Sequence, residues 1–124
     1  MEEVIKKRFF DLAINVYKAL EVIQFPHQAS DIKRQLLRSS SSSAANYRAA
    51  CRAKSSSDFL NKLKIVEEES DETLFWLDFL SEIGIELHDS YSLKKETNEL
   101  LSIIVTSIKT TRNRINRQSN QSKI

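Results

Sequence analysis

One glycine and one proline are the only residues of their kinds among 124, so this chain has few places at which it can turn tightly. Folds built from strands need frequent turns, and turns draw heavily on these two residue types. Their scarcity favours few, long elements, which means helices. We therefore expect an all-α fold, and the length suits one domain with a substantial core.

Apolar residues recur at helical spacing in four segments. In the first segment the steps are of three and four residues, which places the apolar side chains on one stripe. Pro26 separates the first two segments, and Gly84 is a natural C-cap for the third. The pattern predicts helices at about residues 4–23, 28–54, 57–83 and 93–112. We expect them to pack as an up-down-up-down antiparallel four-helix bundle over residues 1–108, followed by a basic, polar and frayed tail at 109–124.

Five consecutive serines, Ser39–Ser43, lie in the middle of the second segment. Serine-rich composition is typical of flexible linkers, which would divide the chain here. However, the apolar spacing continues through the serines from Ile32 and Leu36 to Tyr47, which favours a helix over a linker. Small side chains would let another helix approach closely. A second cluster, Ser55–Ser57, precedes the third segment and predicts its N-cap.

Charge is distributed unevenly along the chain. Residues 28–54 hold six basic side chains and one acidic one, whereas residues 55–84 hold eight acidic and two basic ones. A basic helix joined by a short turn to an acidic helix indicates an antiparallel pair with cross-helix ion pairs.

The stretch LFWLDFL, Leu74–Leu80, is apolar at six of its seven positions. A helix in a bundle buries one stripe and not its whole circumference, so some of these side chains must face something besides the local core. Phe75, Trp76 and Phe79 are therefore candidates for an oligomer interface. Packing within the chain is the alternative.

Asn46 lies near the stripe of the second helix, where a buried amide would need hydrogen-bond partners. Glu68 and Glu72 on the third helix could supply them, which predicts a buried polar layer. An exposed asparagine on the flank of the helix is the alternative.

No motif for catalysis or for a cofactor is present. A carboxylate-bridged metal site in a bundle would use Glu-x-x-His, and neither His27 nor His88 has a glutamate three residues before it. A phosphate-binding loop needs several glycines, and covalent catalysis by Cys51 would need an activating histidine beside it. We therefore expect no enzymatic activity, no metal and no cofactor.

Nucleic acid is the partner that the basic residues suggest. No acidic residue follows Glu99, so the tail carries unneutralised positive charge. The basic side chains of the second helix could instead be used in pairing with the acidic helix, and the tail could serve only for solubility. The candidate nucleic-acid-binding residues are Arg38, Arg48, Arg52, Lys109, Arg112, Arg114, Arg117 and Lys123.

The single cysteine fits a reducing cytoplasm, where we expect the protein to act. No apolar run approaches the roughly 20 residues of a membrane span, and the charged N-terminus does not resemble a signal peptide.

A long central motif carries a resemblance to a known family. It covers Gln35–Leu80 and contains Gln-Leu-x-Arg-Ser, a basic turn ending in serine, Phe-x-x-Lys-Leu and an acidic run before an aromatic. The matching residues are Gln35, Leu36, Arg38, Ser39, Ser43, Asn46, Arg52, Ser55, Phe59, Lys62, Leu63, Glu67, Glu68, Asp71, Glu72 and Trp76. The chain thereby resembles the four-helix bundle proteins also called 23S rRNA intervening-sequence proteins. It departs from them at Ser41–Ser43, where an aliphatic residue is usual.

The resemblance implies a bundle that assembles into a ring, commonly a homopentamer, in a bacterial protein without known enzymatic activity. A related branch, the accessory proteins of diversity-generating retroelements, binds nucleic acid through a basic surface. Our hypothesis is a non-enzymatic, oligomeric adaptor that associates with RNA. The alternative is a protein–protein scaffold or accessory subunit that binds no nucleic acid.

Overall fold

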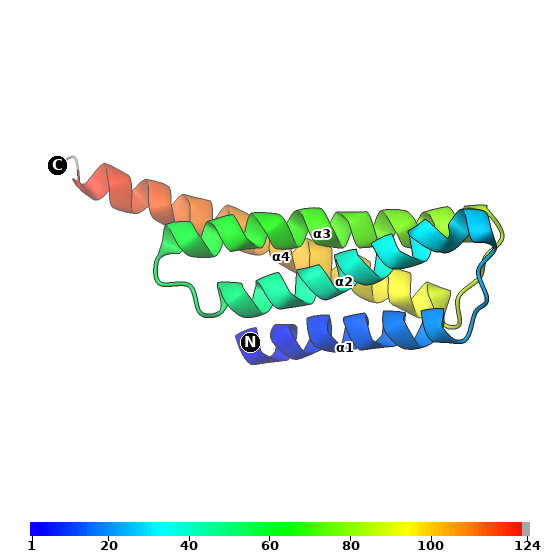
Figure 1. The fold of residues 1–124 in the computed structure, drawn as a ribbon. Helices are drawn as coiled ribbons and strands as arrows, with labels where there is room; N and C mark the ends of the chain where they lie inside the picture. Colours follow the sequence, from blue (N-terminus) through cyan, green and yellow to red (C-terminus); the bar gives the residue numbers. More distant parts are fainter. Residues whose placement is uncertain (123–124) are drawn as a thin grey trace.

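The computed structural model describes residues 1–122, and these residues contain helices and no strands. The all-α prediction is therefore confirmed. A single 3-10 turn precedes the second helix (Figure 1). The elements are α1 (Glu2–Glu21), η1 (His27–Ala29), α2 (Ser30–Ala50), α3 (Ser56–Glu82) and α4 (Ser90–Ser122).

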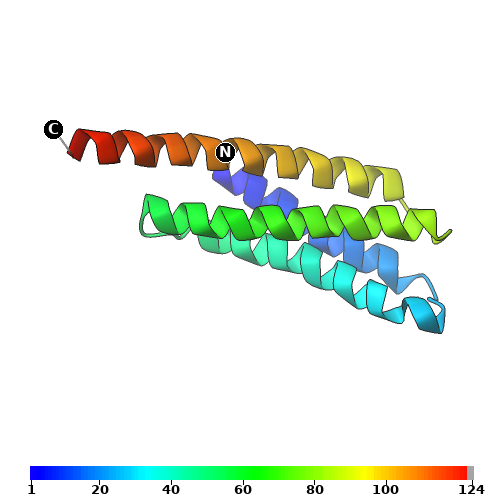
Figure 2. The same ribbon diagram turned by 90° about the horizontal axis from the view of Figure 1, so that it is seen from above.

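The connections alternate between the two ends of the molecule. Figure 1 shows the α1–α2 and α3–α4 connections at one end and the α2–α3 turn at the other, so consecutive helices run in opposite directions. Helix α3 packs against both α2 and α4, and Figure 2 shows α4 running alongside it. The contact between α2 and α3 is the most extensive, and that between α1 and α4 is the least extensive among the neighbouring α-helices.

The serine cluster lies within one uninterrupted helix, α2, so the helix interpretation is confirmed. Ser39, Ser40 and Ser43 are buried, and their hydroxyls donate to carbonyl oxygens of their own helix, for example Ser43 to the Ser40 oxygen at 2.8 Å. Back-bonding of this kind satisfies a buried hydroxyl without a partner from another helix. We call the contact between these serines of α2 and the facing side of α3 the seam. Across it, the Thr73 hydroxyl of α3 lies 2.9 Å from the Ser39 hydroxyl.

The ends of α3 follow from local sequence. Ser55 is the N-cap, and its hydroxyl accepts the Asp58 backbone N–H at 3.0 Å. At the other end Gly84 adopts φ +86°, the left-handed conformation that glycine tolerates best. The Gly84 N–H donates to the Ser81 oxygen and the Ile85 N–H to the Leu80 oxygen, which is the Schellman arrangement.

The core is formed by the apolar stripes of all four helices. Phe9 of α1 stacks on Tyr47 of α2 with 5.2 Å between ring centroids. Around this pair the chain buries aliphatic side chains from each helix, including Leu12, Val16, Leu36, Leu63, Val66, Leu77, Leu80, Leu100 and Ile104.

Helix α4 extends beyond the predicted boundary at residue 112 and reaches Ser122. The expectation of a frayed tail is therefore wrong for residues 109–122, and residues 123 and 124, including Lys123, lie outside the described part of the chain. The cause is that the inward stripe continues as Ile104, Ile108, Thr111 and Ile115. Ile108 and Thr111 are buried, and the Thr111 hydroxyl donates to the Ser107 oxygen. Among residues 1–122, no helix is long and apolar enough to cross a membrane.

Replacing a buried serine of the seam with leucine should destabilise the bundle. Ser40 is 0% exposed, so Ser40→Leu overpacks the contact between helices and should lower the free energy of unfolding by about 1–3 kcal/mol. Ser41 is exposed on the same helix, and Ser41→Leu should change the free energy of unfolding by less than about 0.5 kcal/mol. Urea unfolding at one protein concentration measures both. Equal effects would show that the seam does not limit the helix spacing.

Candidate nucleic-acid interface

The C-terminal half of α4 carries the largest group of unpaired basic side chains. Lys109, Arg112, Arg114 and Arg117 are exposed, and within residues 1–122 no acidic side chain forms an ion pair with any of them. The Arg117 Nε donates to the Asn113 carbonyl oxygen of the same helix. In Figure 1 this part of α4 projects beyond the ends of the other three helices. We call residues 109–122 the basic extension.

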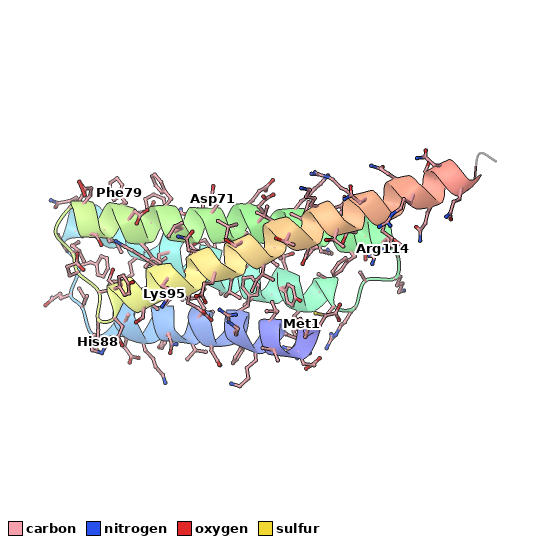
Figure 3. The ribbon with its side chains drawn as sticks, turned by 180° about the vertical axis from the view of Figure 1, so that it is seen from behind. Met1, Asp71, Phe79, His88, Lys95 and Arg114 are labelled. Carbon is pink, nitrogen blue, oxygen red and sulfur yellow. The ribbon has the colours of Figure 1, made fainter. Side chains whose placement is uncertain are left out.

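The basic extension meets the α2–α3 turn at its base. Arg114 lines a hollow of about 300 Å³ together with Lys54 and with Ser55 and Ser56 at the start of α3. Figure 3 shows Arg114 near this turn. The N-terminus of a helix carries partial positive charge, so it adds to the two basic side chains. Glu2 also lines the hollow and is its one acidic side chain.

Two of the predicted residues on the second helix are free for a ligand. Arg48 lies in the last turn of α2 and Arg52 directly after it, and both are exposed. Neither forms an ion pair with another residue in the described range. Arg52 and Lys54 place positive charge at the same end of the bundle as the basic extension.

Arg38, by contrast, is used within the fold. Its guanidinium forms a hydrogen bond with Glu72 and lies 3.4 Å from the Glu69 carboxylate, both on α3. The predicted ion pairing between the basic and acidic helices is thus found at Arg38. This residue should be removed from the nucleic-acid-binding set.

The predicted buried polar layer is wrong in its membership. Glu68 is exposed, Glu72 pairs with Arg38, and the Asn46 amide donates to the Ser42 oxygen of its own helix at 2.9 Å. The buried polar side chains of α2 and α3 are instead Ser39, Ser40, Ser43, Ser70 and Thr73. Four of these hydroxyls donate to a carbonyl oxygen of their own helix, whereas the buried Ser70 hydroxyl has no hydrogen-bond partner within the described residues. A hydroxyl needs few partners, whereas an amide or a carboxylate needs several.

Phe75, Trp76 and Phe79 form one aromatic cluster on α3. Ring centroids are 4.9 Å apart for Phe75 and Trp76, and 5.7 Å apart for Trp76 and Phe79. Phe75 is 55% exposed and Phe79 38% exposed, while Trp76 is half-buried against the core. Figure 3 shows Phe79 on the outer side of α3. The two phenylalanines therefore remain available to a partner, as an interface would require.

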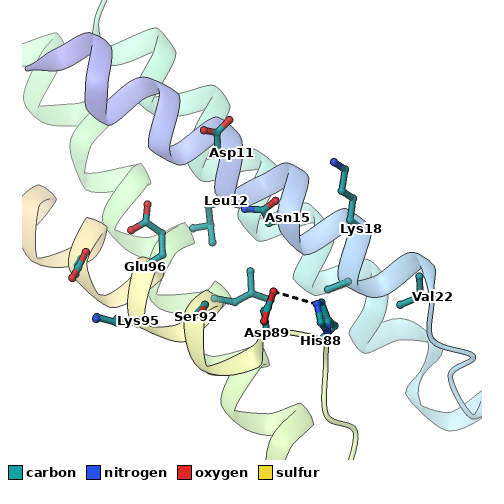
Figure 4. Close-up of a pocket in the computed structure, with 13 residues that line it drawn as sticks. Asp11, Leu12, Asn15, Lys18, Val22, His88, Asp89, Ser92, Lys95 and Glu96 are labelled. Carbon is teal, nitrogen blue, oxygen red and sulfur yellow. Dashed lines mark ion pairs between the residues drawn. The ribbon is translucent and has the colours of Figure 1, made fainter.

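A mixed-charge cleft between α1 and α4 has no counterpart in the sequence predictions. Its volume is about 1020 Å³, and Figure 4 shows Asp11 and Lys18 on one side with Lys95 and Glu96 on the other. The His88 Nε2 lies 3.3 Å from the Asp89 carboxylate. Within the described residues, no group of three or more histidine, cysteine, aspartate or glutamate side chains is placed to hold a metal ion.

Cys51 lies at the end of α2 near Tyr47. Burial is the main cause that raises the pKa of the Cys51 thiol, and it likewise raises the pKa of the Tyr47 hydroxyl. A thiol with a raised pKa is a poor nucleophile, because the thiolate is the reactive form.

Comparison with known proteins shows to which family the chain belongs. The model of the family described as 23S rRNA-intervening sequence protein matches residues 2–106. The chain belongs to this family. No curated protein matches the chain. Its fold is similar to a crystal structure from Bacteroides thetaiotaomicron, described as a protein with unknown function from the S23 ribosomal protein family. That similarity has a TM-score of 0.77 and 28% identity, and it covers 85% of this chain and 98% of the other.

The family match has a boundary within α4. It ends at residue 106, whereas the helix continues to Ser122. The 23S rRNA-intervening sequence protein match therefore covers the bundle, and the basic extension lies beyond it.

Removing the charge of Arg38 should destabilise the protein, whereas removing that of Arg52 should not. Glu69, whose side chain is 18% exposed, would lose the cation beside it in Arg38→Met. We expect a loss of about 1 kcal/mol, because Arg38 is itself half exposed and solvent screens the pair. Arg52→Met is the matched control, because Arg52 is exposed and forms no ion pair in the described residues, and it should be neutral. Thermal or urea unfolding compares them, and equal stabilities would mean that the pair contributes nothing.

Proposed function

We propose that this chain is a non-enzymatic protein that associates with RNA through the basic extension and the adjoining α2–α3 turn. The observation that carries the proposal is the basic extension itself. It is an ordered helix with four basic side chains, and none of them is neutralised by an ion pair in the described part of the molecule. The name of the family, which refers to 23S rRNA, supports RNA as the ligand.

The charges are arranged in a way that suits a phosphate backbone. Arg114 and Lys54 come from different helices and line the same hollow, so two cations and the N-terminus of α3 face one small space. Phosphate oxygens bind arginine, lysine and helix N-termini readily. The chain as a whole carries a net charge of only +2, so bulk attraction is weak and binding depends on this local concentration of charge.

We also propose that the protein acts as a symmetric ring, with five subunits as the resemblance to the family implies. A ring repeats the basic extension once per subunit. Several weak phosphate contacts on one assembly then add their free energies, which raises the affinity well above that of one chain. The reducing cytoplasm suits this role, because RNA is present there and Cys51 stays reduced.

Removing two charges from the basic extension should weaken RNA binding and reduce its dependence on salt. The variant is Arg112→Gln with Arg117→Gln, which keeps the helix. If both arginines contact phosphates, the slope of log K against log salt should fall in magnitude by about 2 for each subunit that contacts the RNA. Filter binding or fluorescence anisotropy with a structured RNA, at several salt concentrations, measures the slope. Single-stranded DNA of equal length tests whether RNA is preferred.

The matched control is Lys18→Gln with Lys95→Gln, which removes the same charge from the rim of the α1–α4 cleft. It should leave the slope unchanged. Arg38→Met should also bind RNA normally once it is folded. If the unaltered protein does not bind RNA detectably, or if its binding does not depend on salt, the proposal is contradicted and a protein–protein scaffold is favoured.

The unaltered protein should be larger than one chain in solution. Light scattering after size exclusion should give five times the chain mass of 14.3 kDa, with a value that changes little on moderate dilution. A mass of 14.3 kDa at all concentrations would contradict ring assembly, and another multiple would contradict the pentamer alone.

A further inference from the structure

An apolar groove runs along the outside of the bundle between α1 and α2. Its volume is about 870 Å³. Phe10, Ile14 and Tyr17 of α1 form one wall, and Ala44 and Ala45 of α2 lie opposite. Phe10 is 56% exposed and Tyr17 49% exposed. We call this surface the α1/α2 groove. Large side chains face small ones across it, so the groove leaves room for a bulky apolar occupant.

The same chain carries an occupant of suitable chemistry. The aromatic cluster of Phe75, Trp76 and Phe79 lies on α3, which forms no part of the α1/α2 groove. Both surfaces remain exposed within one chain, so the cluster of a chain does not fill its own groove. Exposed apolar surfaces of this kind usually mark interfaces.

The charges around the two surfaces are complementary. The residues that line the groove include three basic side chains, Lys6, Lys7 and Arg48, and a single acidic one, Glu3. Lys6 pairs with Glu3 at 2.8 Å and Lys7 with Asp11 at 2.9 Å, whereas Arg48 forms no ion pair within residues 1–122. The groove therefore keeps an excess of positive charge. Around the aromatic cluster α3 carries Asp71, Glu72, Asp78 and Glu82 and has no lysine or arginine after Lys64. Arg38 pairs with Glu72 and Lys94 with Asp78, which leaves Asp71 and Glu82 without an ion pair in residues 1–122.

We propose that a second copy of this chain inserts its aromatic cluster into the α1/α2 groove. This inference rests on the proposed self-association and specifies which surfaces meet. A contact between two aromatic clusters would bring one acidic surface against another, whereas cluster against groove brings acidic against basic. The interface therefore joins two different surfaces of the chain, which makes it heterologous.

A heterologous contact leaves one free groove and one free cluster at the ends of any open chain of subunits. Such contacts close into a ring where the rotation between neighbours permits it. The basic extension belongs to neither surface, so it stays exposed in the assembly and remains available to RNA.

A mixing experiment tests the inference. Ala45→Glu blocks the groove with a negative charge at an exposed helical position, and Phe75→Ser with Phe79→Ser removes the cluster. Each variant alone should give the mass of one chain by light scattering. Mixed in equal amounts, they should give a dimer of 28.6 kDa, twice the chain mass of 14.3 kDa. The reason is that one intact groove meets one intact cluster and the other surfaces are disabled.

The controls separate this inference from self-association in general. Tyr91→Ser removes a 78% exposed aromatic outside both surfaces and should leave the mass unchanged. Circular dichroism checks that each variant is helical, and Tyr17→Ser offers a second groove variant if Ala45→Glu does not fold. Full assembly of both folded groove variants, or a mixture that stays monomeric, overturns the pairing of cluster with groove. A monomeric unaltered protein overturns self-association itself.

Discussion

The close contact between α2 and α3 is the constraint on which the rest of the structure depends. It is set by buried serines on α2 and by Thr73 on α3, whose hydroxyls lie within hydrogen-bond distance of carbonyl oxygens of their own helices. Because those hydroxyls are satisfied locally, they avoid the penalty of a buried unpaired group. The buried Ser70 hydroxyl of α3, by contrast, has no hydrogen-bond partner within residues 1–122. Arg38 adds charge pairing at the edge of the same contact, and the Ser55 cap fixes where α3 begins.

The register of α2 against α3 also determines which side chains of α3 face solvent. With Ser39 facing Thr73, α3 turns Val66 and Leu77 to the core, while Phe75 and Phe79 face solvent. One helix therefore contributes both to the bundle and to an exposed aromatic surface, which explains why its apolar content exceeds that of a single stripe. At the opposite end of the seam, the short turn brings Lys54 beside Arg114 of α4.

Most of the fold could be predicted from the spacing of apolar residues, because that spacing persists through Ser39–Ser43 and stops near Pro26 and Gly84. The errors share a cause. The polarity of Asn46, Glu68 and Glu72 predicts a buried layer of an amide and carboxylates, but the protein buries hydroxyls, because these can back-bond to their own helix. The basic composition after Ile108 predicts an early end to α4, but the inward stripe continues through Thr111 and Ile115. Arg38 and Arg48 are both exposed, and what separates them is ion pairing, which depends on neighbours distant in the sequence.

The net charge is only +2, but acidic and basic side chains are concentrated on different surfaces of the molecule. Acidic side chains gather on α3, where Glu69 and Glu72 pair with Arg38, and Asp71, Asp78 and Glu82 lie around the aromatic cluster. The largest group of basic side chains without an ion pair among residues 1–122 is on the part of α4 that projects beyond the other helices (Figure 1). If the same acidic and basic residues were mixed evenly over the surface, their charges would cancel and no surface would have a strong electrostatic potential. Separation gives the chain an acidic, apolar surface and a basic, polar one on different helices. Assembly and RNA association can then occupy different surfaces of the same molecule without competing.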